Sequence, residues 1–170
     1  MGKNEYFQYY VEGDNEKKLL SVLKTDLGLI VSGKIEKLNV VQEKLTPIRL
    51  MQLKKDTTVI LVFDTDAGNI NILNENINIL KKCTFVKQII CVPQVKNLED
   101  ELIRSCDINQ IKELLGSKSN KDYKHDLVVE KNLKEKLILH KFDIDKFWNQ
   151  LPTGMYHSIK NESRKVKILK

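Results

Sequence analysis

The sequence contains few of the residues that characterise small secreted scaffolds and membrane proteins. Its 170 residues include three cysteines, three prolines and one tryptophan. An odd number of cysteines, at spacings of eight and fifteen residues, matches neither a disulfide framework nor a zinc pattern. No apolar run approaches the length of a membrane span, and the first residues contain neither an apolar signal region nor the myristoylation pattern. We therefore expect a cytoplasmic protein that has no membrane partner.

Apolar and charged residues are balanced as in a folded domain. Hydrophobic residues make up 41% of the chain and charged residues 31%, which supplies a core and excludes a disordered chain. A length of 170 residues favours one main domain with a small appendage. Gly116 and the polar stretch after it predict a main domain over residues 1–115 and a basic, mainly helical extension over residues 116–170.

The positive charge of the chain is concentrated near its end. The net charge is +6, and residues 1–110 carry equal numbers of acidic and basic side chains, so the whole excess lies in residues 111–170. A basic segment beside a neutral one predicts a polyanionic partner, with nucleic acid first. The alternative is a solvated, lysine-rich surface. Because no aromatic stripe suggests base stacking, we expect contacts to the phosphate backbone.

Apolar runs alternate with amphipathic segments over the first two thirds of the chain. Residues 57–63, TTVILVF, form the strongest run and predict a central strand that is buried on both faces. The alternation predicts an α/β domain with a mostly parallel four-stranded sheet flanked by helices. Residues 34–45 fit a strand or a helix equally well. The expected strands are 6–11, 27–32, 57–63 and 85–92, and the expected helices are 16–24, 47–54, 69–82, 98–104, 108–115, 131–139 and 143–151.

Residues with strong local preferences mark the ends of several elements. Asp14 or Asn15 is the expected N-cap of the first helix. Thr46 is the expected N-cap of the second, with Pro47 at its first helical position. Pro93 is expected to end the fourth strand, since it cannot donate a backbone hydrogen bond.

Carboxylates follow two of the expected strands. Glu12 follows the first strand, Asp64 and Asp66 follow the third, and Glu16 lies four residues after Glu12. The carboxyl ends of parallel strands meet at one edge of a sheet, where ligands collect. Asp64 and Asp66 are two residues apart, so on an extended segment both can face one site. Carboxylates in one crevice repel one another, and a hard divalent cation such as Mg²⁺ or Mn²⁺ relieves that repulsion.

These acidic residues also have ordinary structural explanations. Glu12, Asp64 and Asp66 each precede a helix and can accept hydrogen bonds from its first N–H groups. Glu99 begins an acidic run just past the fourth strand. It can join the site, or it can simply interact with the positive end of a helix dipole.

The two strand-end motifs together resemble the signatures of the Toprim domain, the catalytic module of topoisomerases, bacterial primases and several nucleases. The family pattern is an apolar strand ending in Glu-Gly and another ending in Asp-x-Asp, here in VEGDNE and FDTDAG. Glu16, three residues after Gly13, makes the form more similar to small Toprim nucleases, such as the overcoming-lysogenization-defect family or the enzyme that matures ribosomal RNA precursors. The resemblance covers residues 4–110 and implies a Toprim-like, Rossmann-like fold for them.

The resemblance implies a Mg²⁺-dependent nuclease that cleaves phosphodiester bonds of DNA or RNA. It implies Glu12, Asp64 and Asp66 as catalytic residues, and the same three with Glu16 and Glu99 as ligands of Mg²⁺ or Mn²⁺. Toprim nucleases are familiar in phage defence, so a partner protein such as an ATPase is also implied. The alternatives are a ribonuclease of the ribosomal-RNA-processing type, and a Toprim-like module that binds nucleic acid or a partner protein without cleaving it.

Positive side chains near such a site would neutralise the phosphate. Lys96, Arg164 and Lys165 are the candidates for contacts with nucleic acid, and nothing in the sequence chooses between them. The three histidines are scattered without metal spacing, so we expect them to be ordinary surface or core residues.

Overall fold

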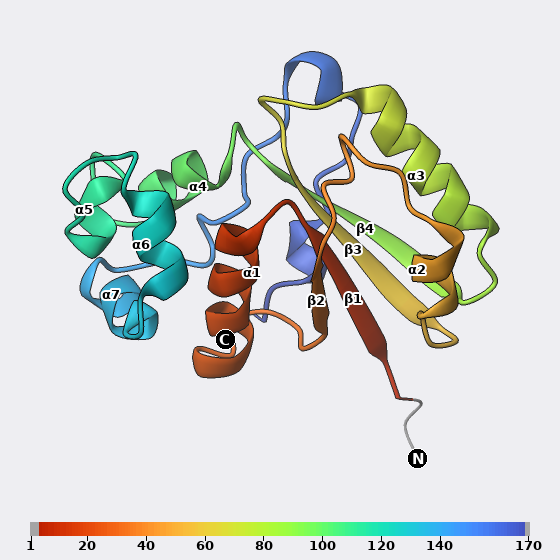
Figure 1. The fold of residues 1–170 in the computed structure, drawn as a ribbon, viewed down its shortest axis with the longest axis horizontal. Coiled ribbons are helices and arrows are strands. Elements are labelled where there is room, and N and C mark those ends of the chain that lie inside the picture. The colour runs from red at the N-terminus through yellow and green to blue at the C-terminus, as the bar shows by residue number, and fades with distance from the viewer. Residues whose placement is uncertain (1–3, 169–170) are drawn as a thin grey trace.

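The sheet at the centre of the fold has four parallel strands. A computed structural model describes residues 4–168, and within them the strand order is β2-β1-β3-β4 (Figure 1). All neighbouring pairs are parallel, so each connection crosses over a face of the sheet. The predicted α/β class, with a Rossmann-like parallel sheet flanked by helices, is confirmed. The strands are β1 (Tyr6–Val11), β2 (Lys34–Lys37), β3 (Thr57–Asp64) and β4 (Val86–Gln94).

All side chains of β3 are buried, as predicted for a central strand. Its neighbours are β1 on one side and β4 on the other. Alternate side chains face opposite layers. Ile60 and Val62 join one apolar core, whereas Val59, Leu61 and Phe63 join the other. The continuous apolar run in the sequence therefore reflects burial on both faces.

Helices cover both faces of the sheet (Figure 1). α2 and α3 pack on one core, and α1 packs on the other together with the group from α4 to α7. No described helix is long and apolar enough to cross a membrane. The helices are α1 (Asp14–Ser21), α2 (Pro47–Met51), α3 (Ile70–Lys82), α4 (Leu98–Ser105), α5 (Lys112–Leu115), α6 (Tyr123–Val129) and α7 (Leu133–Leu139), with short helical turns η1 (Val22–Asp26), η2 (Gly154–Tyr156) and η3 (Ser163–Lys165).

Local signals placed several of these helices correctly. The Thr46 hydroxyl accepts a hydrogen bond from the Arg49 N–H at 3.4 Å, and Pro47 is the first residue of α2. α3 and α4 match their predicted ranges within a residue. Of residues 108–115, which were predicted to be helical, only those of α5 form an α-helix. Gly116 caps its C-terminal end with backbone in the left-handed region, at φ of 66°.

The last third of the chain packs against both faces of the sheet. Phe147, Trp148 and Val166 are buried in the core that also contains α1. Tyr156 lies in the other core, where its ring centroid is 5.6 Å from that of Phe63. Residues before and after position 116 thus contribute to shared cores, and the division of the chain at that point stays a prediction.

The second strand lies later in the chain than expected. Residues 27–32 form no strand, and the only bridge in this stretch is an antiparallel one that joins Ile30 to Lys167. The Val31 N–H donates to the carbonyl of Val166 at 2.9 Å. The strand that pairs with β1 at this edge of the sheet is β2 instead. The prediction of a strand over 27–32 is wrong because this apolar backbone pairs with a segment near the other end of the chain.

Two further predictions are wrong. Pro93 does not end β4, which continues to Gln94. Among the described strands β4 pairs with β3 alone, so it is an edge strand, where a missing N–H is tolerated. Residues 143–151 form turns rather than a helix. At Trp148 the backbone adopts the left-handed region with φ of 59°, which a right-handed helix excludes.

Candidate metal centre

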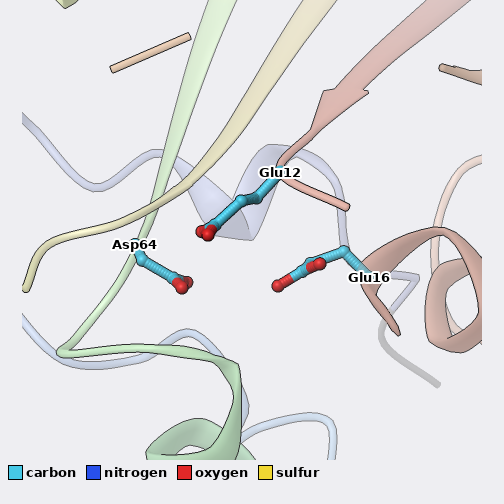
Figure 2. Close-up of side chains that lie close together, drawn as sticks. All are labelled: Glu12, Glu16 and Asp64. Atoms are coloured by element: carbon cyan, nitrogen blue, oxygen red, sulfur yellow. The ribbon is translucent and has the colours of Figure 1, made fainter. Parts of the chain in front are cut away.

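Three carboxylates meet at the carboxyl edge of the sheet. Glu12 follows β1, Asp64 ends β3, and Glu16 lies in the first turn of α1. One oxygen of each lies within 4.8 Å of an oxygen of each of the others. The three side chains point toward a common centre (Figure 2). We refer to Glu12, Glu16 and Asp64 as the acidic cluster; they are three of the five metal ligands expected from the sequence.

The pairing of two strands and a tight turn explain this convergence. β1 and β3 are parallel neighbours, with Tyr10 opposite Leu61, so both strands end at the same edge. Gly13 then forms the N-cap of α1 with extended backbone. Its N–H donates to Glu16 Oε2 at 3.1 Å, which turns this side chain back toward the end of β1.

The predicted N-cap of α1 is wrong. Asp14 is the first residue of the helix, and its carboxylate lies 2.9 Å from Lys37 Nζ. Asn15 also lies inside the helix. The reciprocal hydrogen bond of a capping box comes from Glu16 instead, so this residue stabilises the start of the helix and also contributes an oxygen to the acidic cluster.

Burial and mutual repulsion control the charge of the acidic cluster. Glu16 and Asp64 are buried. Burial, a hydrogen bond with Glu12 and the charges of Glu12 and Glu16 together raise the pKa of Asp64 far above its usual range. Burial is also the main cause that raises the pKa of Glu16, and the charge of Glu12 adds to it. The cluster therefore holds a proton that exposed carboxylates lose well below neutral pH, and a bound cation would displace that proton.

Asp66 and Glu99 lie outside the acidic cluster. Asp66 Oδ2 accepts a 2.9 Å hydrogen bond from Asn97 Nδ2. Glu99 Oε1 lies 3.7 Å from Lys124 Nζ. The charge of Glu99 still contributes to the raised pKa of Glu16. Neither residue belongs to the group of three carboxylates, and their assignment as ligands stays a prediction.

The three candidate contacts with nucleic acid lie in different parts of the fold. Lys96 is exposed in the loop after β4, where its carbonyl accepts the N–H of Asp66 at 3.0 Å, close to the acidic cluster. Lys165 in η3 forms a 2.6 Å ion pair with Glu162. Arg164 lines a cavity of about 550 Å³ in the C-terminal segment. Of the three candidates, Lys96 is joined directly to the loop that follows β3.

Gln94 and Tyr123 also lie beside the acidic cluster, although neither is among the residues expected from the sequence. Gln94 Nε2 donates a 2.6 Å hydrogen bond to Asp64 Oδ1. Tyr123 is fully buried, its hydroxyl has no hydrogen-bond partner within the described residues, and burial and the charges of Glu99 and Glu16 raise its pKa. No sequence signal marks either residue, because the proline before Gln94 suggests the end of a strand and Tyr123 lies in a stretch that is typical of a linker.

The donor set of the acidic cluster consists of oxygen atoms alone. Such a set suits hard divalent cations, Mg²⁺ or Mn²⁺, better than zinc, which prefers nitrogen and sulfur. Comparison of the chain with protein-family models, with curated proteins and with solved structures finds no match.

Proposed function

We propose that this protein is a Mg²⁺-dependent nuclease that cleaves phosphodiester bonds of nucleic acid. The observation that carries the proposal is the convergence of Glu12, Glu16 and Asp64 at the carboxyl edge of a parallel sheet. The resemblance of both strand-end motifs to small Toprim nucleases supports the same activity. A role in phage defence, with a partner such as an ATPase, belongs to this proposal as well.

The acidic cluster would hold the cation, and the fold positions its three carboxylates before the cation binds. Two ligands come from strand ends and one from a helix whose first turn is hydrogen-bonded to Gly13. Burial of Glu16 and Asp64 lowers the local dielectric, so these carboxylates attract a cation more strongly than exposed ones do. Bound Mg²⁺ would supply an activated water and neutralise charge on the phosphate. Asp66 and Glu99, which the resemblance also implies as ligands, lie outside the acidic cluster, so we expect each of them to contribute less to metal binding than its three members.

Lysines around the acidic cluster support a polyanionic substrate. Lys37 pairs with Asp14, the residue at the start of α1. Lys124 pairs with Glu99, and Lys96 is exposed in the loop after β4. Together with the net charge of +6, these side chains favour binding to the phosphate backbone. Such binding is weakly sequence-specific and weakens as salt increases.

A matched pair of substitutions tests the metal site. Glu12→Gln and Asp14→Asn each remove one carboxylate charge without changing side-chain shape, and only Glu12 belongs to the acidic cluster. We expect Mn²⁺ to raise the thermal midpoint of the wild type and of Asp14→Asn, and to leave that of Glu12→Gln unchanged. Cleavage of nucleic acid should likewise be retained by Asp14→Asn and lost in Glu12→Gln. Equal stabilisation of all three proteins by Mn²⁺ would contradict the assignment.

A panel of substrates separates the possible activities. Duplex DNA, single-stranded DNA and structured RNA are each incubated with wild-type protein and Mg²⁺ or Mn²⁺, beside Glu12→Gln. Cleavage of DNA supports the nuclease proposed here, and cleavage of structured RNA alone indicates the ribosomal-RNA-processing type. Intact substrates, together with retained binding of metal and nucleic acid, would replace the nuclease by a non-cleaving module.

A further inference from the structure

The side chain of Gln94 connects the acidic cluster to the C-terminal segment. Gln94 is fully buried at the end of β4. Its Nε2 donates to Asp64 Oδ1 at 2.6 Å, and its Oε1 accepts from Trp148 Nε1 at 3.1 Å. One amide thus joins a proposed metal ligand on β3 to a residue more than fifty positions further along the chain.

The chemistry of the two partners determines which way the amide faces. An indole N–H can only donate, so Trp148 requires an acceptor and Gln94 must present its oxygen there. The amide nitrogen is then directed at Asp64, where it donates to the carboxylate. The indole therefore determines that Asp64, a proposed metal ligand, faces a hydrogen-bond donor at this position.

Trp148 is itself held firmly by its backbone. Its N–H donates to Glu101 Oε2 at 2.8 Å, and Glu101 is fully buried. Its carbonyl accepts hydrogen bonds from Asn161 Nδ2 at 2.8 Å and from Ser163 Oγ at 2.7 Å. These hydrogen bonds fix the backbone of Trp148. Its fully buried indole packs against Phe147 with ring centroids 4.5 Å apart, so it has little room to turn away from Gln94.

We propose that Gln94 is a positioning residue, oriented by Trp148, that sets the affinity of the acidic cluster for a divalent cation. The inference rests on the proposed function, since it concerns the same cluster. By bonding one oxygen of Asp64, Gln94 fixes the direction in which this carboxylate faces Glu12 and Glu16. The C-terminal segment thereby contributes to the metal site without supplying a ligand.

Substitutions along the chain of hydrogen bonds test this proposal. Gln94→Leu removes the donor at Asp64, and Trp148→Phe removes the indole N–H that orients it. Binding of Mn²⁺ alone is measured by isothermal titration calorimetry at equal ionic strength. We expect each variant to bind Mn²⁺ about 10- to 100-fold more weakly, the usual effect of losing a hydrogen bond to a metal ligand. The double variant should be no weaker than Gln94→Leu, because both changes act through one bond.

Tyr9→Phe is the matched control. It also removes one hydroxyl or N–H donor from a buried aromatic side chain, in this case the 2.6 Å hydrogen bond from the Tyr9 hydroxyl to the Val31 carbonyl. Its Mn²⁺ affinity should equal that of the wild type. An equal loss in Tyr9→Phe and Trp148→Phe would assign the effect to general destabilisation and overturn the positioning role.

The wild-type protein offers a second measurement that needs no folded variant. The chain has one tryptophan, so its indole N–H gives a single, assigned NMR signal. Titration with diamagnetic Mg²⁺ should shift this signal saturably, since a cation bound at Asp64 alters the hydrogen bond from Gln94 and, through the same amide, the one to the indole. A signal that stays in place while Mg²⁺ binds overturns the proposal.

The two proposals fail in different ways. If wild-type protein binds neither Mg²⁺ nor Mn²⁺, the proposed function fails and the positioning role fails with it. If wild-type protein binds Mn²⁺, Asp64→Ala abolishes that binding and Gln94→Leu leaves it unchanged, the positioning role alone is overturned.

Discussion

The side-chain amide of Asn97 donates a 2.9 Å hydrogen bond to Asp66 Oδ2 and holds this carboxylate outside the acidic cluster. Asp66 and Asp64 belong to one Asp-x-Asp motif, yet they have different partners. Asp64 is buried and bonded to Gln94, whereas Asp66 is exposed at the start of the loop. Two acidic residues that are equivalent in the motif therefore have different environments.

The different environments predict different effects on metal binding. Asp64→Ala removes an oxygen from the acidic cluster and should abolish measurable Mn²⁺ binding. Asp66→Ala removes only an exposed charge, which water and salt screen, so we expect Mn²⁺ affinity to fall by no more than about threefold. Calorimetric titration of both variants checks this order. Comparable losses in the two variants would place Asp66 among the ligands in the folded protein.

Asp64 should make the metal-free protein less stable as pH rises. Its pKa in the folded state is raised far above that of the unfolded chain, where it is about 3.9. The folded state thus binds a proton that the unfolded state has released. The stability contributed by this proton is complete below the unfolded pKa and is lost as pH rises toward the folded pKa.

Asp64→Asn isolates this contribution, because an amide resembles the protonated acid and does not titrate. In EDTA, we expect the free energy of unfolding of the wild type to fall relative to the variant from pH 6 to pH 9, by at most about 1.4 kcal/mol per pH unit. Urea denaturation at each pH measures the difference. Parallel profiles for the two proteins would show that Asp64 ionises normally in the folded state.

Gly68, in the loop after β3, has no room for a side chain. Its φ is +81°, and an added Cβ would lie 2.8 Å from the Val41 carbonyl oxygen, which the Asn69 N–H already binds at 2.8 Å. We expect Gly68→Ala to lower the free energy of unfolding for two reasons. A non-glycine residue in the left-handed region costs about 1–2 kcal/mol, and steric overlap of the new Cβ with Val41 costs about 1–3 kcal/mol more.

Gly116→Ala is the control for this comparison. Its φ is +66°, and no atom lies within 4 Å of an added Cβ. It should therefore show the left-handed cost alone. Chemical denaturation of both variants measures the two terms, and equal losses would exclude steric contact with Val41 as a cause.

Asn76 on α3 stabilises the loop before α2. It is fully buried, its Oδ1 accepts the Leu45 N–H at 2.8 Å, and its Nδ2 donates to the Val40 and Glu43 carbonyls at 2.8 Å each. Asn76→Ala leaves these backbone groups without partners, so we expect it to lower the free energy of unfolding by at least about 2 kcal/mol. The exposed Asn74→Ala on the same helix should change stability by less than about 0.7 kcal/mol. Denaturant midpoints of the two variants check this contrast.

The fold class and the place of the candidate site can both be predicted from the sequence. Both follow from local patterns. The apolar run of β3 indicates burial on two faces, and the acidic residues that follow β1 and β3 mark where the strands end. Neighbouring parallel strands must end at one edge of a sheet, so Glu12 and Asp64 are brought together by topology alone.

Tertiary contacts, by contrast, select the acidic residues that come together and the side chains that hold them. Asp66 is bonded to Asn97 and Glu99 pairs with Lys124, and both carboxylates lie outside the acidic cluster. Gln94 and Trp148 reach Asp64 from segments that carry no local signal. These contacts depend on strand pairing and side-chain packing between residues far apart in the chain, and the periodicity of a single segment contains no information about them.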